Sequence, residues 1–341
     1  MRARIAALIA AQGPISVADF MALANGAYYA ARDPLGPAGD FTTAPEISQM
    51  FGELIGLWCA QAWLDQGRPS PKRLVELGPG RGTLMRDALR ALARVSGFRD
   101  GLDVVLVEAS PALAALQRQN VPEARHAPAF DARLTDRPLF VLANEFFDAL
   151  PIRQFVKTRS GWHERMIALD GEALRFVLSP VAAMQGDAPD GAVRETCPMA
   201  EAVVEEIARA IAAQGGGALI VDYGYDRAGF GETLQAVRAH AFADVLSAPG
   251  ETDLSAHVDF AALRNAAERG GAKAYGPVPQ GAFLEALGIR QRAARLAGVN
   301  PGEAEALAAA TARLTEAGQM GRLFKALAIV PRDVPTPPGF S

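Results

Sequence analysis

The chain has 341 residues, of which 50% are hydrophobic and 21% are charged, and its 34 basic and 38 acidic residues give a formal net charge of −4. This composition is typical of a globular protein with a sizeable core and excludes a wholly disordered chain. Because the sequence contains no block of like charge, we expect no nucleic-acid-binding face.

The longest stretch without a charged side chain, 5–18, is interrupted by glycine and proline and is shorter than the roughly 18 apolar residues that a membrane span needs. The N-terminus faintly resembles a signal peptide, but Ser16 and Asp19 have the spacing of a helix cap, so we expect none. Cys59 and Cys197 are far apart, and the histidines show no metal-ligand spacing. We therefore predict no disulfide framework, no metal site and a reducing compartment.

Apolar residues at helical spacing predict three helices in the N-terminal part of the chain, the third beginning near residue 45. The segment before that helix is rich in glycine and proline and is expected to be irregular. Asp40, Phe41 and Glu46 could close over a ligand. Thr43 and Glu46 also have the spacing of a capping box, which is the stronger expectation for Glu46.

After residue 70 the pattern changes to alternating strands and helices. Strands are predicted at 73–77, 103–108, 139–143 and 217–223, with helices at 83–95 and 111–119 between the first three. This alternation predicts an α/β fold with a parallel sheet, helices on both faces, and a ligand site at the carboxyl ends of the strands.

The rest of the chain departs from this alternation. Three alternating stretches with turn glycines predict an inserted β-meander at about 152–180. Further predicted elements are helices near 258–269, 281–287 and 302–316, a strand at 323–330, and a loose Pro-rich tail.

The sharpest motif lies between the first predicted strand and its helix. Glu76 ends the strand, Gly78, Gly80 and Gly82 follow, and Thr83 begins the helix. Glycines there allow positive φ and bring backbone N–H groups close to a ligand at a helix N-terminus. The spacing differs from the G-x-G-x-x-G of dinucleotide-binding folds and lacks the lysine of a P-loop. It resembles the E-x-G-x-G-x-G motif of class I S-adenosylmethionine methyltransferases, whose loop holds the methionine end of the cofactor. A tight strand–helix turn without a ligand is the alternative.

The second predicted strand ends in Glu108, and Ala109 separates it from Ser110 and Pro111, which have the pattern of an N-cap and a first helical residue. A carboxylate at this strand end can accept hydrogen bonds from both ribose hydroxyls of an adenosine. A solvated acid near a helix N-terminus is the alternative. Together with the glycines, the position favours ribose binding.

The third predicted apolar strand runs into Asn144, Glu145, Phe146 and Asp148. Two acids three residues apart would share one side of a helical turn, and paired carboxylates match the planar, always charged guanidinium. They would orient its nitrogen and favour proton loss as a C–N bond forms. A helix N-cap with Phe146 in the core is the alternative. Tyr223, at the next strand end, could line an acceptor channel or belong to a plain turn.

Blocks of sequence over about 39–330 resemble the MidA-type methyltransferases, a family that includes the mitochondrial complex I assembly factor. They are GDFTTAPEISQMFGELIGLW (39–58), VELGPGRGTL (75–84), VEASPALAALQ (107–117), LANEFFDALPIRQF (142–155), VDYGY (221–225), GETLQAVRAH through TDLSAHVDF (231–260), GPVPQGAFLEALGI (276–289) and MGRLFKALAI (320–329). The resemblance implies a class I, Rossmann-like fold with a mostly parallel seven-stranded sheet. It also implies S-adenosylmethionine as cofactor, bound by Glu76, Gly78, Pro79, Gly80, Gly82, Thr83, Glu108 and Ala109.

By the same resemblance, the protein is expected to be a protein-arginine N-methyltransferase that acts on a core subunit of the hydrophilic arm of respiratory complex I and supports its assembly. Glu145, Asp148 and Asn144 are the predicted catalytic residues. Asp40, Phe41 and Glu46 are predicted to form a lid over the cofactor, and Phe146 and Tyr223 to line the acceptor site. Because no transit segment is recognisable, we expect a bacterial, cytoplasmic member, and we leave a homodimer open.

Two other functions stay open from the sequence. One is a non-enzymatic complex I assembly chaperone that retains cofactor binding, and the other is a nicotinamide-dependent dehydrogenase, which the glycine spacing disfavours. The expected domains are an N-terminal helical cap (1–70) and a methyltransferase domain (71–331) followed by a tail (332–341). The second domain would carry a β-rich insertion at about 152–180 and a helical insertion at about 281–318.

Overall fold

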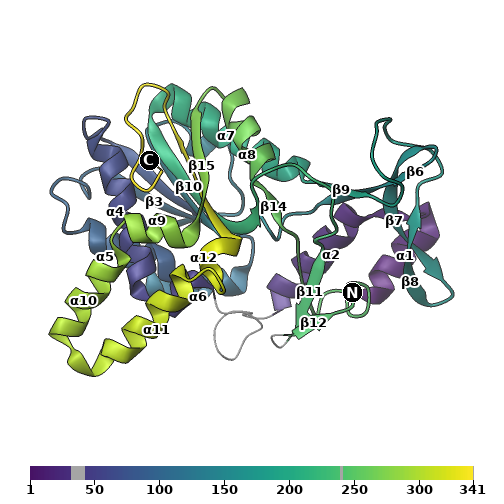
Figure 1. The fold of residues 1–341 in the computed structure, drawn as a ribbon, viewed down its shortest axis with the longest axis horizontal. Helices are drawn as coiled ribbons and strands as arrows, with labels where there is room; N and C mark the ends of the chain where they lie inside the picture. The colour runs from purple at the N-terminus through teal and green to yellow at the C-terminus, as the bar shows by residue number, and fades with distance from the viewer. Residues whose placement is uncertain (32–42, 239–240, 341) are drawn as a thin grey trace.

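The computed structural model describes residues 1–31, 43–238 and 241–340. Its centre is a large sheet in the order β15-β16-β10-β5-β2-β3-β4, with the short β14 beside β10 (Figure 1). The strands are β2 (Lys72–Leu77), β3 (Leu102–Val107), β4 (Arg125–Ala127), β5 (Leu139–Asn144), β10 (Gly216–Tyr225), β14 (Val258–Asp259), β15 (Lys273–Pro279) and β16 (Phe324–Val330). The neighbouring strands β4, β3, β2, β5 and β10 pair in parallel, and β16 is antiparallel to both β10 and β15. The predicted mostly parallel sheet is therefore confirmed.

Helices cover both faces of this sheet because its strands are apolar on both sides, as in other parallel sheets. In β2, Leu74 joins the hydrophobic cluster that includes α4 and α5, whereas Val75 joins the cluster that includes α7 and α8. The helices are α1 (Arg2–Gln12), α2 (Val17–Ala31), α3 (Ala44–Ile47), α4 (Gln49–Leu64), α5 (Thr83–Leu92), α6 (Pro111–Asn120), α7 (Pro198–Gln214), α8 (Phe260–Arg269), α9 (Gln280–Ala286), α10 (Ile289–Val299), α11 (Ala304–Thr315) and α12 (Met320–Leu323). None of the helices in the described ranges has the length and apolarity to span a membrane.

The four predicted strands and the two helices between them occur as β2, β3, β5, β10, α5 and α6. The helices expected in the last third correspond to α8, α9 and α11, and the last strand to β16. The elements that the prediction missed include β4, β14, β15, α7, α10 and α12. It was wrong about the tail, because the Phe340 ring packs against Phe283 with centroids 5.3 Å apart.

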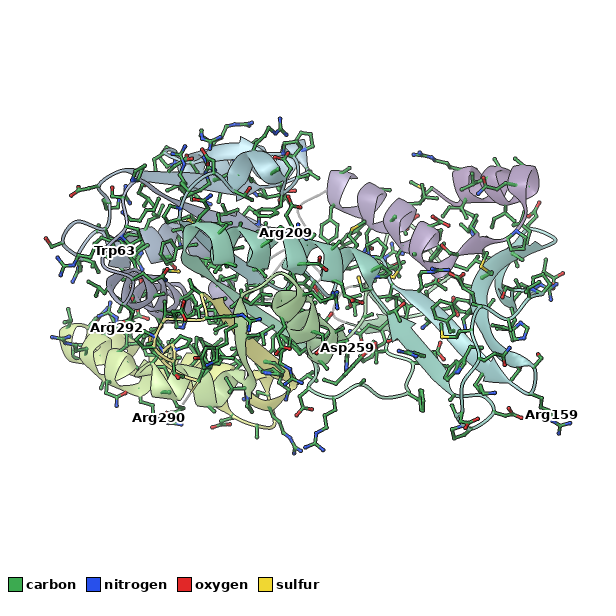
Figure 2. All side chains as sticks on the ribbon, turned by 90° about the horizontal axis from the view of Figure 1, so that it is seen from above. Trp63, Arg159, Arg209, Asp259, Arg290 and Arg292 are labelled. Atoms are coloured by element: carbon green, nitrogen blue, oxygen red, sulfur yellow. The ribbon has the colours of Figure 1, made fainter. Side chains whose placement is uncertain are left out.

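The inserted meander is part of a larger sheet. Its three predicted strands are β6 (Arg153–Thr158), β7 (Gly161–Asp170) and β8 (Ala173–Leu178), and they are joined by β1 (Ile15–Ser16) and β9 (Val193–Thr196). A further small sheet, which the sequence did not indicate, contains β11 (Gln235–Arg238), β12 (Ala241–Ala243) and β13 (Asp253–Ser255). Figure 2 shows Arg159, at the β6–β7 turn, projecting at the end of the molecule opposite Arg290 and Arg292.

The N-terminal helices belong to two different cores. Ile5 of α1 and Phe20 of α2 pack with Ile167 of the inserted sheet, whereas Trp58 of α4 lies in the cluster on one face of the large sheet. The segment expected to form one helical cap over 1–70 thus contributes to two hydrophobic clusters. The division of the chain into domains stays a prediction.

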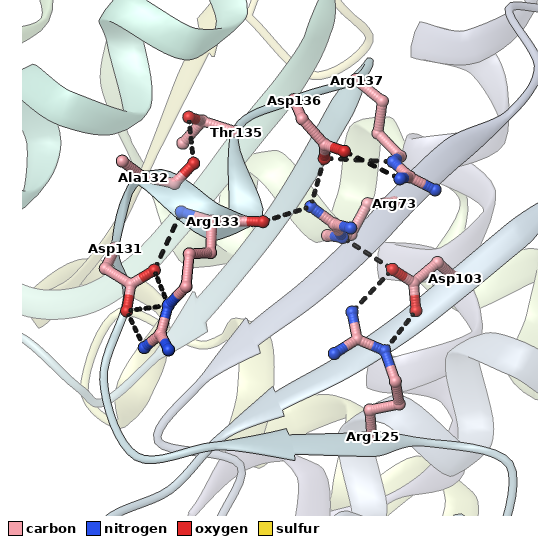
Figure 3. Close-up of polar contacts among 9 residues, drawn as sticks. All are labelled: Arg73, Asp103, Arg125, Asp131, Ala132, Arg133, Thr135, Asp136 and Arg137. Atoms are coloured by element: carbon pink, nitrogen blue, oxygen red, sulfur yellow. Dashed lines mark hydrogen bonds and ion pairs between the residues drawn. The ribbon is translucent and has the colours of Figure 1, made fainter.

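An ion-pair network holds the amino ends of the central strands (Figure 3). Arg73 of β2 is almost fully buried and donates hydrogen bonds to Asp103 of β3 and to Asp136 just before β5, both at 2.7 Å. Arg125 of β4 pairs with the same Asp103 at 2.8 Å. Because these contacts join four segments at one end of the sheet, they stabilise the strand arrangement that places the opposite, carboxyl ends together.

Candidate active site

The carboxyl ends of β2, β3, β5 and β10 border a cavity of about 940 Å³. This volume is at the upper end of the range of roughly 300–1,000 Å³ for small-molecule sites. The predicted site residues that line it are Glu46, Glu76, Gly78, Pro79, Gly80, Thr83, Glu108, Ala109, Asn144, Glu145, Phe146, Asp148 and Tyr223. Gly82 is not among the lining residues, and Asp40 and Phe41 lie outside the described residues.

The glycine loop has the backbone geometry that the sequence predicts. Gly78, Gly80 and Gly82 have φ values of 61°, 53° and 81°, in the left-handed region that favours glycine. Gly82 is the N-cap of α5. A Cβ atom on Gly78 would lie 2.9 Å from Cδ2 of Phe146, so a side chain there would push into the cavity wall. The loop therefore depends on glycine both for its conformation and for the space beside it.

Glu76 is a buried acid at the edge of this loop. It is 2% exposed, and its Oε2 atom has no hydrogen-bond partner among the described residues. Burial raises the pKa of its carboxyl well above the ordinary value, against a hydrogen bond from the Met85 backbone. Since buried polar groups are nearly always paired, this oxygen is available to a donor group of a ligand in the cavity.

Glu108 is held against the cavity wall rather than solvated. Its Oε1 accepts a hydrogen bond from the Ser110 backbone N–H at 2.7 Å, and its Oε2 accepts one from Gln117 Nε2 at 3.1 Å. Burial raises the pKa of this carboxyl. The Ala109 backbone N–H also acts on this carboxylate. A carboxylate has about four acceptor positions, so Glu108 keeps acceptor capacity for a ligand.

The predicted capping box at Glu46 is wrong. The Thr43 side chain makes no cap hydrogen bond, and Glu46 Oε1 instead accepts a hydrogen bond from Thr83 Oγ1 at 2.5 Å. Arg81 Nη1 lies 3.9 Å from the other carboxylate oxygen. The capping geometry is local, whereas the fold brings α5 against α3 and offers Glu46 a stronger pair of partners. Glu46 consequently ties α3 to the end of the glycine loop.

The acidic loop after β5 is a turn, so both the helical spacing and the helix N-cap proposed from the sequence are wrong. Glu145 has a φ of 50°, and its Oε1 accepts hydrogen bonds from the Ala44 backbone N–H and from Asn144 Nδ2, both at 3.2 Å. Asp148 Oδ2 accepts a hydrogen bond from the Tyr223 hydroxyl at 2.6 Å. Both acids nevertheless line the same cavity. A strained, non-glycine φ costs about 1–3 kcal/mol and is typical of functional sites.

Asp222 organises this turn, a role that the sequence analysis missed. Its Oδ2 accepts hydrogen bonds from the backbone N–H groups of Phe146, Phe147 and Asp148 at 3.2, 2.9 and 3.3 Å. Its Oδ1 accepts one from the Tyr223 N–H at 2.9 Å. The only signal in the sequence was an acid at the end of a strand. Its partners could be recognised only once β10 was known to lie beside β5.

Burial and like charge raise the pKa values of the acids that line the cavity. Burial, and after it the like charge of the neighbouring Asp148, raises the pKa of Glu145 to about 7. Burial raises the pKa of Asp148 to about 6. Within the described ranges neither acid forms an ion pair, and Asp148 Oδ1 has no hydrogen-bond partner. Arg313 lowers the pKa of Glu145 only slightly against these effects. Buried acids that are not ion-paired are suited to bind a cation from outside.

Other cavity residues that the sequence analysis missed come from distant segments. Tyr29 of α2 donates a hydrogen bond from its hydroxyl to Asp253 Oδ1 of β13 at 2.7 Å. Asn25, one turn earlier, donates from Nδ2 to the Leu254 and Ala149 carbonyls. Arg313 of α11 also lines the cavity. The N-terminal helices and the later insertions therefore complete a site whose floor is formed by the large sheet.

Three comparisons identify relatives of this chain. Residues 54–278 match the model of a family described as "Putative S-adenosyl-L-methionine-dependent methyltransferase". The mitochondrial protein arginine methyltransferase NDUFAF7 of Xenopus tropicalis is 38% identical, with 98% of this chain and 87% of that protein covered. The human protein of the same name is 40% identical, with 83% and 72% covered.

A solved structure shows the same fold. A Burkholderia thailandensis protein with S-adenosyl-homocysteine bound superimposes with a TM-score of 0.87 and 29% identity, over 99% of this chain and 93% of that chain. These findings exclude the nicotinamide-dependent dehydrogenase considered above. The chain therefore belongs to the S-adenosylmethionine-dependent methyltransferase family, an enzyme family with the class I α/β fold and S-adenosylmethionine as its cofactor.

Proposed function

We propose that this protein methylates an arginine side chain of a protein substrate, a core subunit of the hydrophilic arm of respiratory complex I. The observation that carries the proposal is the pair of carboxylates, Glu145 and Asp148, which line the cavity and form no ion pair among the described residues. Arg313 lines the same cavity and is close enough to favour the charged form of Glu145, but it is not ion-paired with either acid. Relatives named protein arginine methyltransferases support it. The complex I subunit follows from the family resemblance.

The cellular location of the protein and its oligomeric state are also part of what we propose. The named relatives are mitochondrial, whereas we expect this chain to act in the cytoplasm of a bacterium. A homodimer stays a prediction.

The residues around the glycine loop fit the cofactor. S-adenosylmethionine, when bound, would supply a methyl group on a sulfonium sulfur, which leaves readily as a neutral thioether. The unpartnered Oε2 of Glu76 is suited to a hydrogen bond from the ammonium group, and Glu108 has free lone pairs for the ribose hydroxyls. The positive-φ glycines leave the backbone of the loop open to the methionine end.

The turn after β5 that carries Glu145 and Asp148, here called the acidic turn, fits the guanidinium of an acceptor arginine. Glu145 and Asp148 would each accept N–H groups of one guanidinium, which fixes the plane and the direction of the attacking nitrogen. Asn144 Oδ1 has no partner in the described chain and could accept a further N–H. When the C–N bond forms by in-line displacement, the methylated nitrogen loses a proton. Glu145, whose pKa is about 7, is suited to accept it near neutral pH.

Replacing Glu108 should weaken cofactor binding. In Glu108→Ala we expect the affinity for S-adenosyl-homocysteine, measured by calorimetry, to fall by about 10- to 100-fold, because a charge-assisted hydrogen bond contributes roughly 1.5–3 kcal/mol. Glu123→Ala is the matched control, since Glu123 is an exposed acid that pairs with Arg99 at the surface. Unchanged affinity in a folded Glu108→Ala protein would contradict the ribose assignment.

The reaction should depend on pH through the two acids. Glu145 and Asp148 must be ionised to hold a guanidinium, and their pKa values of about 7 and about 6 mean that both are increasingly protonated as the pH falls below neutral. We expect kcat/KM for the acceptor, at saturating cofactor, to rise between about pH 5 and about pH 8 and then level off. A constant value over this range would contradict the role of these carboxylates.

A further inference from the structure

Within the residues that the structure describes, three large exposed apolar side chains line the cavity, together with an exposed cation, Arg313. Among the large apolar side chains exposed in the described part of the chain, Met199, Phe242 and Leu323 line the cavity, with exposed fractions of 51%, 80% and 46%. We call these three side chains the apolar rim. They come from the first turn of α7, from β12 and from the last residue of α12. Single exposed apolar residues are ordinary on protein surfaces, but several around one opening mark a binding site.

The rim is continuous with the acidic floor. Leu323 is followed by Phe324, whose ring packs against Tyr223 with centroids 5.4 Å apart. Tyr223 in turn donates its hydroxyl hydrogen bond to Asp148. A group that enters between the rim residues therefore meets the acids next. The cofactor residues Glu76 and Glu108 lie on other strands of the same cavity.

We infer that the apolar rim binds the residues on either side of the target arginine, so that the preferred acceptor is a protein segment with an arginine between large apolar side chains. This inference rests on the proposed arginine methylation. Such a segment would match both parts of the cavity. Its guanidinium matches Glu145 and Asp148, and its aliphatic or aromatic neighbours bury the exposed surface of the rim. Basic neighbours would lose water against the same surface without gaining a partner there.

The test compares short peptides that differ only around one central residue. With the full chain and saturating S-adenosylmethionine, we expect kcat/KM for Leu-Arg-Leu to exceed that for Ser-Arg-Ser by about tenfold, in line with the burial of apolar side chains. In Phe242→Ser the ratio of the two kcat/KM values should fall towards one, and Phe242→Leu should restore it. Val181→Ser is the matched control, because Val181 is 75% exposed but does not line the cavity.

Equal rates for the two peptides, or a full preference retained in Phe242→Ser, Met199→Ser and Leu323→Ser alike, would overturn the inference. A Leu-Lys-Leu peptide separates it from the proposed function. Equal transfer to lysine contradicts arginine methylation itself, whereas arginine-specific transfer without a flank preference contradicts only the role of the rim. If the wild type bound phosphatidylcholine vesicles and Phe242→Ser did not, the rim would be assigned to a membrane instead. If Phe242→Ser dissociated a dimer, the rim would be assigned to a second copy of the chain.

Discussion

Glu145→Gln should lower single-turnover methyl transfer to arginine by at least about a hundredfold while S-adenosyl-homocysteine binding stays as in the wild type. Removing one partner of a buried ion pair costs about 3–5 kcal/mol, and here the loss would appear in the transition state. The amide keeps the shape of the side chain, including an oxygen for the Ala44 N–H, but removes the charge and the proton acceptor. The measurement is transfer of a labelled methyl group to a complex I subunit that carries the acceptor arginine.

Asp148→Asn should likewise lower methyl transfer, since Asp148 Oδ2 accepts the Tyr223 hydroxyl hydrogen bond and its Oδ1 has no partner among the residues that the structure describes. Glu172→Gln is the control, because Glu172 is an exposed acid at the β7–β8 turn. Wild-type rates in both Glu145→Gln and Asp148→Asn would show that the acids do not bind the acceptor. Loss of transfer together with normal complex I assembly in cells would favour the chaperone alternative as the biological role.

Asp222→Ala should destabilise the fold and also lower methyl transfer. The carboxylate accepts hydrogen bonds from four backbone N–H groups around the acidic turn, and each buried donor left without a partner costs about 1–3 kcal/mol. Removing a buried acid offsets part of this loss. We therefore expect the free energy of unfolding, measured by urea denaturation, to fall by about 2–4 kcal/mol.

Asp259→Ala is the matched control for Asp222→Ala. Asp259, which Figure 2 labels, caps α8 by accepting one backbone hydrogen bond from Ala262 and does not line the cavity. Loss of such a cap costs about 1 kcal/mol, and methyl transfer should persist. Asp222→Asn, which keeps one acceptor oxygen, should lie between the wild type and Asp222→Ala. If Asp222→Ala were no less stable than Asp259→Ala and fully active, the acidic turn would be held by other contacts.

The part of the site formed by neighbouring residues was predictable from the sequence. A strand, a glycine turn and a helix follow one another over 72–92, and the positive φ of Gly78 depends only on the absence of its own side chain. Glu108 likewise takes its position from β3, which ends one residue before it, and from the helix cap at Ser110. The alternation of strands and helices also predicted the parallel sheet, because each element shows its own local spacing of apolar residues.

Only the tertiary structure decided what depends on distant partners. The sequence placed Glu145 and Asp148 near each other, but the turn that aims them is held by Asp222, on a strand brought beside β5 by sheet pairing. Glu46 has the local spacing of a cap, yet it bonds to Thr83 because α3 and α5 meet in the fold. Such contacts depend on which elements pack together, and no local pattern encodes that choice. The sequence alone therefore determined the cofactor motif, and long-range packing determined the geometry of the acceptor side.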